Sequence, residues 1–151
     1  MNAQLSIQIL QAYATGLAAQ SLQHKVQGKL FGSMGFSKLA DKYAEHATEE
    51  MEWVDKFIDR IIDLGGEAKV EATPAMPVYK DPVEYIKSDL EVSETEVPKL
   101  AQATLSVADD FATYDLLKAY CLDEEEDMFW SRGQLELIEC IGKQNWLIKQ
   151  L

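Results

Sequence analysis

The stretch EEMEWVDKFIDRI, residues 49–61, places a glutamate where a helix could present it to a metal ion. In helix bundles a Glu-x-x-His pair supplies two ligands to a di-iron centre, because residues three apart share one helix face. Glu50 stands at the first position of such a pair, but Trp53 occupies the position of the histidine. The pattern indicates either a metal site or a relative that has lost its metal.

The two histidines, His24 and His46, are the second set of candidate ligands. His24 lies seven residues after Leu17 and His46 seven before Trp53, on the inward seams of two helices that we expect to run antiparallel. Both imidazoles should therefore lie at one level of the bundle, with Glu50 one turn from His46. Two imidazoles and a carboxylate could hold one zinc or iron(II) ion. The alternative is a buried pair hydrogen-bonded to polar neighbours: Glu50, Ser131 or Gln134.

The acidic run DEEED at 123–127 covers all faces of a helix, so most of it must be solvated. Only Glu124 and Asp127 follow the inward seam. Together with Glu50 they make three inward acids, with no lysine or arginine placed by the sequence to pair with them. Such groups cannot all be ionised in a dry core, so we expect them to bind a cation, water or protons.

Four long helical segments must position these residues. Inward residues recur at spacings of three and four over residues 5–31 and 37–64. Start and end signals predict two further long helices over residues 82–107 and 111–141, and KQNWLIKQL a short fifth helix. Gly65 and Gly66 end the second helix, and Asp81 followed by Pro82 starts the third. The stretch between them is a long crossover, and Pro98 should kink or break the third helix. The pattern predicts an all-α four-helix bundle with one long crossover.

Composition limits the function further. A chain of 151 residues with 47% hydrophobic content fits one domain with a filled core, and the net charge of −12 argues against nucleic acid. Residues 1–40 contain no Asp or Glu. The start lacks a basic region, no segment is long and apolar enough for a membrane span, and two cysteines fit free thiols. We expect a cytoplasmic protein without a membrane partner.

Four stretches give the chain a resemblance to the bacterioferritins over nearly its whole length: GFSKLADKYAEHATEEMEWVDKFIDRI, YIKSDLEV, LDEEEDMFW and GKQNWLIKQL. The resemblance implies a single ferritin-like domain over residues 1–151. It also implies iron storage in a 24-subunit shell, Fe(II) oxidation at a di-iron site in each bundle, and haem bound between two subunits through a methionine from each.

The six di-iron ligands of that family are only partly kept. The matching positions, in chain order, are Leu17, Glu50, Trp53, Ser93, Glu124 and Asp127. Three keep a carboxylate and both histidines are gone, whereas a bridged di-iron site needs about four carboxylates and two imidazoles. Glu91 and Glu94 flank Ser93 but should point away from the seam. We expect the ferroxidase centre to be impaired or absent, without autonomous activity.

Other positions of the resemblance lie on the flanks of the second helix. The haem methionine falls on Met51, about 100° around the helix from Glu50, where a thioether could be an axial ligand to haem iron. The alternative is a methionine that packs at a dimer interface without haem. Glu45 and Glu49 resemble residues that line the storage cavity, where carboxylates can seed ferric mineral; a solvated face is the alternative.

The sequence therefore predicts a bacterioferritin-like iron-storage cage subunit. Its partners would be copies of itself, in a dimer at least and up to a 24-mer, and a ferroxidase-active paralogue in mixed shells. Two alternatives remain: a metalloenzyme with a relocated mononuclear site at His24, His46 and Glu50, or a purely structural ferritin-like dimer.

Overall fold

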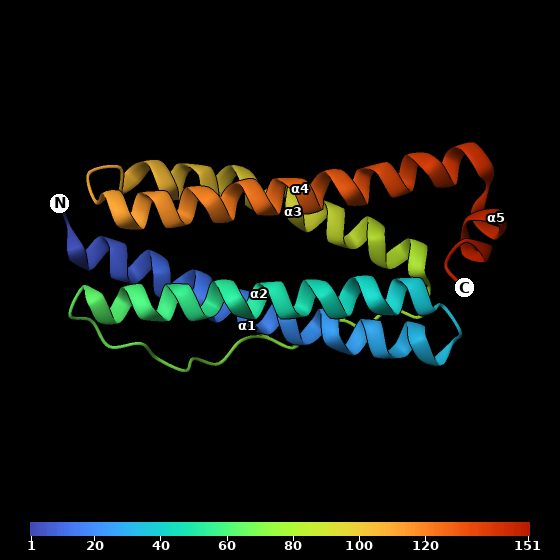
Figure 1. Cartoon of the computed structure of the whole chain (residues 1–151), viewed down its shortest axis with the longest axis horizontal. Coiled ribbons are helices and arrows are strands. Elements are labelled where there is room, and N and C mark those ends of the chain that lie inside the picture. The colour runs from blue at the N-terminus through green and yellow to red at the C-terminus, as the bar shows by residue number, and fades with distance from the viewer.

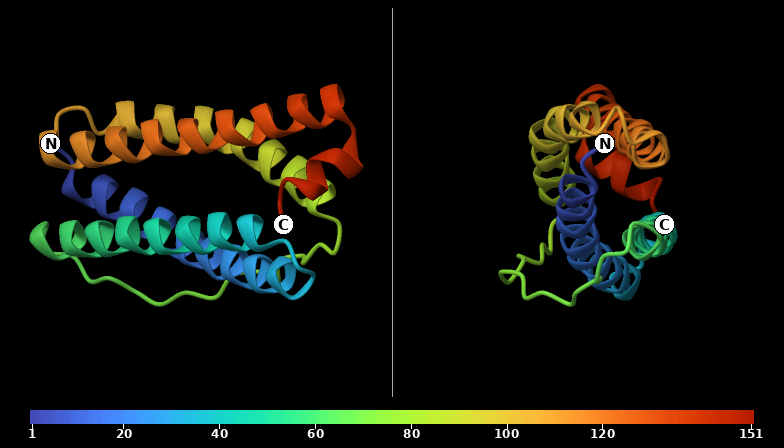
Figure 2. Two further views of the ribbon diagram at one scale, coloured as in Figure 1. Left: turned by 45° about the vertical axis from the view of Figure 1, so that its right-hand side comes forward. Right: turned by 90° about the vertical axis from the view of Figure 1, so that its left-hand side faces the viewer.

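The computed structural model describes residues 1–151 as five helices without a strand (Figure 1). They are α1 (Ala3–Ser33), α2 (Ser37–Asp63), α3 (Pro82–Ser106), α4 (Phe111–Ile141) and α5 (Lys143–Ile148). Short turns join α1 to α2 and α3 to α4, and residues 64–81 form the long crossover, which runs outside α1 and α2 in both views of Figure 2. This confirms the predicted all-α bundle with one crossover and a short terminal helix. No helix has the length and apolar character needed to cross a membrane.

The helix ends follow the predicted signals. The Asp81 side chain accepts a hydrogen bond from the backbone N–H of Val83 at 2.9 Å, and Pro82 opens α3. After α2, Gly65 has a φ of +79°, which L side chains rarely adopt, and the N–H of Gly66 donates to the carbonyl of Ile61 at 2.9 Å. Glycine at position 65 thus allows the chain to leave the helix with its last carbonyls satisfied.

Alanine should have opposite effects at two glycines. We expect Gly65→Ala to lower the free energy of unfolding by about 1–2 kcal/mol, because the left-handed backbone strains any side chain there. Gly133 lies inside α4, where an added Cβ would meet nothing within 4 Å. Gly133→Ala should therefore raise the free energy of unfolding by roughly 0.5–1 kcal/mol. Thermal unfolding measured at one subunit concentration checks both, and equal shifts for the two variants would contradict the assignment.

Pro98 lies within α3 without ending it. Proline has no N–H to donate to the carbonyl four residues earlier, which weakens the helix locally. Figure 1 shows the axis of α3 changing direction between its two halves while the helix continues to Ser106. Of the two expected outcomes, the kink is the one observed.

Two apolar clusters fill the bundle. The first contains buried residues from all four long helices and their connections: Leu10, Ala14, Leu17, Val54, Phe57, Ile61, Leu100, Val107, Leu117 and Tyr120. The second lies towards the other end and includes the tryptophan of α5: Phe31, Leu39, Tyr43, Val83, Tyr85, Ile86 and Trp146. On each long helix, inward-facing polar residues lie between the part that packs in the first cluster and the part that packs in the second. The bundle therefore has two apolar ends separated by a polar layer.

Asp110 connects three helices at the end of the bundle where α4 begins. This carboxylate is 2% exposed, accepts from Arg60 Nη2 at 2.7 Å and Ser6 Oγ at 2.8 Å, and accepts from Thr113 Oγ1 at 2.6 Å. Burial alone would raise the pKa of Asp110, but the hydrogen bonds from Thr113, Ser6 and Arg60 outweigh it and lower the pKa. Asp110 is thus ionised in the folded protein and ties α1, α2 and α4 together.

Two glutamines of α1 hold the crossover. Gln11 accepts from the N–H of Lys69 at 2.7 Å and donates to its carbonyl at 3.0 Å. Gln27, which is fully buried, accepts from the N–H of Tyr79 at 2.5 Å and donates to its carbonyl at 2.9 Å. Each amide thus pairs with both backbone groups of one crossover residue, as a neighbouring strand would.

Candidate metal centre

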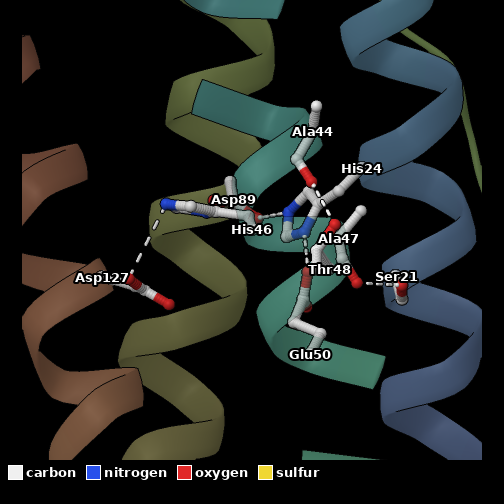
Figure 3. Close-up of polar contacts among 9 residues, drawn as sticks. All are labelled: Ser21, His24, Ala44, His46, Ala47, Thr48, Glu50, Asp89 and Asp127. Atoms are coloured by element: carbon white, nitrogen blue, oxygen red, sulfur yellow. Dashed lines mark hydrogen bonds and ion pairs between the residues drawn. The ribbon is translucent and has the colours of Figure 1, made fainter. Parts of the chain in front are cut away.

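The polar layer consists of inward-facing ionisable side chains of all four long helices: His24, His46, Glu50, Asp89, Asp123, Glu124 and Asp127. Figure 3 shows how His24, His46, Glu50, Asp89 and Asp127 lie relative to one another. As predicted from the sequence, the two histidines lie at one level, with ring centroids 5.7 Å apart. The candidate metal-binding side chains of the bundle therefore lie in this layer.

Both ring nitrogens of His24 face carboxylates. Nδ1 contacts Glu50 Oε1, and Nε2 lies 3.2 Å from Asp89 Oδ1 (Figure 3). Burial alone would lower the pKa of His24, but the hydrogen bonds with Asp89 and Glu50 outweigh it and raise the pKa to about 10. His24 is therefore a buried imidazolium that donates to both acids, and it supplies the cation that the sequence had not indicated.

Sequence reasoning missed Asp89. It lies three and four residues after the buried residues Ile86 and Tyr85, so the inward face of α3 continues through it. That spacing could have placed Asp89 in the layer. Of the partners predicted for the histidines, Glu50 is confirmed, whereas Gln134 instead accepts from Trp146 Nε1 at 3.0 Å.

His46 differs from His24 although it is equally buried. Its Nε2 is fully enclosed, has no hydrogen-bond partner, and lies 3.7 Å from Asp127 Oδ1. Burial, with smaller contributions from the charges of His24 and Lys42, lowers the pKa of His46 to about 4. His46 is therefore neutral, and a neutral imidazole keeps one nitrogen with a free lone pair.

The carboxylates of α4 are crowded together. Asp123, Glu124 and Asp127 each offer an oxygen, and these oxygens lie within 4.8 Å of one another. Burial, then repulsion from neighbouring acids, raises the pKa of Glu124 to about 9 and that of Asp127 to about 7. Burial likewise raises the pKa of Glu50, and one of its oxygens is enclosed without a partner. Without a cation this cluster retains protons at neutral pH.

At two positions where the resemblance implies metal ligands, the chain has side chains that cannot bind a metal ion. Leu17 is 3% exposed and belongs to the first apolar cluster. Trp53 packs against Phe57 and Tyr120, with ring centroids 6.4 and 5.6 Å away, and donates from Nε1 to Asp123 Oδ2 at 3.0 Å. An indole N–H cannot ligate a metal. Trp53 instead orients a carboxylate of the layer.

Ser93 is half-buried, and both glutamates beside it on α3 are exposed, as expected. Together with Leu17, Ser93 lines a groove of about 540 Å³ between α1 and α3, which also reaches Tyr120 and Glu124 of α4. The groove therefore connects the outer surface with a carboxylate of the polar layer.

The flanking residues of α2 face away from the first cluster. Met51 is 42% exposed, Glu45 is exposed and Glu49 is half-buried. Burial, then the charges of Glu45 and Asp123, raises the pKa of Glu49. A recess of about 180 Å³ beside it is formed by Glu49, Glu52, Trp53, Lys56 and Asp123. This recess opens between α2 and α4, next to the layer.

Comparison with known proteins gives consistent matches. The ferritin-like domain family matches residues 7–141. A bacterial ferritin of Neisseria meningitidis serogroup B is 34% identical over 139 residues, covering 89% of this chain and 88% of that protein. A bacterial ferritin of Pseudomonas aeruginosa is 30% identical over 148 residues, covering 96% of each, and a bacterioferritin of Brucella melitensis biotype 1 is 25% identical over 127 residues, covering 82% of this chain and 78% of that protein.

Proposed function

The chain belongs to the ferritin-like domain family, and from this premise we propose that it is an iron-storage shell subunit whose di-iron ferroxidase centre is impaired or absent. Its relatives are named bacterial ferritins and bacterioferritin, which supports iron as the cargo. The remnant carboxylates of the centre would be Glu50, Glu124 and Asp127. In this proposal the subunit contributes shell and cavity surface rather than a complete oxidation site.

The observation that carries the proposal is the packing of Leu17 and Trp53. Leu17 is enclosed by apolar neighbours, so no ligand atom is available from α1 at that position. The Trp53 indole fills the place next to Asp123 and uses its only polar hydrogen there. One imidazole, His24, already has both nitrogens engaged by acids. A pair of iron ions would need four carboxylates and two imidazoles around it, and this arrangement supports fewer.

We expect the purified homomer to oxidise Fe(II) slowly, without the absorbing di-ferric intermediate that a paired site forms. Stopped-flow absorption after mixing with Fe(II) and oxygen measures this. A rapid phase with two irons per subunit would contradict the proposal.

A gain-of-function variant makes the test sharper. Leu17→Glu, Trp53→His, Ser93→Glu and Asp127→His together would restore the six-ligand set. The rapid phase should appear in this variant if the rest of the bundle remains competent. Circular dichroism and size-exclusion check that the variant folds. A wild type that already shows the rapid phase would overturn the proposal of an impaired ferroxidase centre.

We further propose that Met51 binds haem shared with a second copy. Its thioether is on the outer flank of α2, 42% exposed in the single chain, so the sulfur is accessible to a group bound between subunits. A thioether is an established axial ligand, so the residue fits the group. Bound haem would supply a one-electron redox centre.

Haem binding has a direct optical test. After reconstitution with haem, wild type should show a Soret band with two methionine ligands, and Met51→Leu should lose that ligation, because leucine keeps the apolar volume but has no sulfur. The matched control is Met34→Leu, which changes an exposed methionine after α1. A missing Soret band in wild type would leave Met51 as an interface residue.

The assembly proposed is a homo-oligomer, a dimer at least and up to a 24-subunit shell, located in the cytoplasm, into which a ferroxidase-active paralogue could be mixed. Size-exclusion of the native protein, with visible spectrum and iron content recorded on one peak, tests it. A dimer as the final species would exclude a storage shell and favour the structural alternative.

A further inference from the structure

The Nε2 atom of His46 is one of four enclosed side-chain polar atoms without a hydrogen-bond partner, together with Tyr43 Oη, Glu50 Oε2 and Tyr85 Oη. Its residue is 3% exposed, and its Nε2 has no hydrogen-bond partner. Figure 3 shows the ring of His46 directed towards Asp127 across the layer. The separation from Asp127 Oδ1 is 3.7 Å, longer than the roughly 2.7–3.2 Å of a direct N–H···O hydrogen bond. An enclosed polar atom of this kind requires a partner.

The same separation fits two ligands of one ion. Donor atoms at about 2.0–2.1 Å from a zinc ion lie roughly 3.4 Å apart in tetrahedral geometry. Beyond Asp127, the oxygens of Asp123 and Glu124 lie within 4.8 Å of each other and of an Asp127 oxygen. The His46 nitrogen is close to Asp127 but does not share this spacing with all three oxygens, so an ion would have to draw His46 and the acids of α4 together around a common centre.

We propose that His46, Asp123, Glu124 and Asp127 bind a single divalent transition-metal ion. The nitrogen comes from α2, two turns before Trp53, and the oxygens come from α4. This site differs from the relocated site predicted from the sequence, because His24 is not a ligand: both of its nitrogens are engaged by Glu50 and Asp89. It also goes beyond the storage proposal and does not depend on a shell.

The types of ligand atom limit which ions could bind. One imidazole and three carboxylates suit zinc, iron(II) or manganese(II), whereas calcium and magnesium prefer oxygen alone. Trp53 is a positioning residue, because its N–H holds Asp123 Oδ2 and leaves the other oxygen of Asp123 for the ion. The recess lined by Glu49 and Asp123 between α2 and α4 gives a cation an acidic path to the ligands.

Zinc is the probe for the test, because it binds without redox chemistry. Titration calorimetry of the iron-free full-length protein should show one zinc per subunit for wild type, and His46→Leu and Asp127→Asn should each weaken binding by about 10-fold or more. The matched control is Glu126→Gln, which removes an exposed charge from the same acidic run. It should leave zinc affinity unchanged, because the charge is solvated.

The site itself is located by anomalous scattering at the zinc edge in crystals grown with zinc. The expected peak lies between His46 and Asp127. A peak elsewhere, no peak, or equal zinc affinity in wild type and His46→Leu would overturn the proposal. Cobalt(II) gives a second readout, because its visible absorption bands should change when His46 is replaced. Circular dichroism checks that the variant keeps its fold. Zinc binding is scored without iron uptake, so its failure leaves the storage proposal standing.

Discussion

Asp110→Ala should lower the free energy of unfolding by about 3–5 kcal/mol, the cost of removing one partner of a buried ion pair. The substitution leaves Arg60 without its carboxylate and removes the acceptor of Ser6 and Thr113. Three helices lose a shared contact at once, and α4 loses its N-cap. Urea unfolding followed by circular dichroism at fixed subunit concentration measures the loss.

The neighbouring aspartate provides the control. Asp109 has a side chain that is 65% exposed and pairs only with the amino terminus, 3.1 Å away. Asp109→Ala should change the free energy of unfolding by less than about 1 kcal/mol, as is usual for an exposed pair. Similar losses for the two adjacent aspartates would show that Asp110 does not act through burial.

The stabilisation by Asp110 depends on pH in a defined direction. Because the folded-state pKa of Asp110 is lower than its ordinary value of 3.8, its contribution is fully present above that value. The contribution is lost as the pH falls through the lowered pKa. Unfolding measured from pH 7 downwards should therefore show wild type and Asp110→Asn converging only in strong acid, and a difference independent of pH would contradict the assignment.

Replacing His24 should have the second large effect. His24→Leu should lower the free energy of unfolding by about 3–5 kcal/mol, because the buried Glu50 and the partly buried Asp89 would then be left without a cation. His46→Leu is the matched control. Both histidines are nearly fully buried, at 2% and 3% exposure, but His46 carries no charge and its Nε2 donates to nothing. Exchanging an unpaired polar group for an apolar one of similar volume should cost less than about 1 kcal/mol in metal-free protein.

A double substitution separates charge from packing at His24. If the loss comes from uncompensated acid, then His24→Leu combined with Glu50→Leu should be less destabilised than the sum of the two single variants by about 1 kcal/mol or more. Thermal unfolding of the four proteins at one pH completes the cycle. Strict additivity would mean that His24 and Glu50 do not act on each other.

The level of the two histidines and the inward direction of Glu50 could be predicted because they follow from helical periodicity within α1 and α2. The caps at Gly65 and Asp81 could be predicted because they depend on neighbouring residues only. Asp89 was not found, since its direction depends on the rotation of α3, and this helix bends near its proline. The pair of Arg60 and Asp110 joins residues 50 positions apart at a turn, where no periodicity applies.

The missing hydrogen-bond partner of His46 Nε2 could not be predicted either. Its side chain follows a regular seam, as the sequence indicated, but the absence of a partner depends on every neighbouring side chain. Glu124 and Asp127 were predicted to face inward, but Asp123 was not, and the distances among the three acids come only from the fold. What the sequence lacks is therefore the distances between side chains on different helices, and these distances decide whether a set of ligands becomes a site.

The crossover is held by Gln11 and Gln27, and neither amide carries a charge. Salt screens charged pairs but has little effect on such neutral bonds, and acid does not protonate them. The polar layer responds to both, since its acids and His24 titrate or pair by charge. A change of salt or pH that alters ion binding in the polar layer should therefore leave the crossover attached to α1. Ions can then bind in the middle of the bundle without loosening this segment.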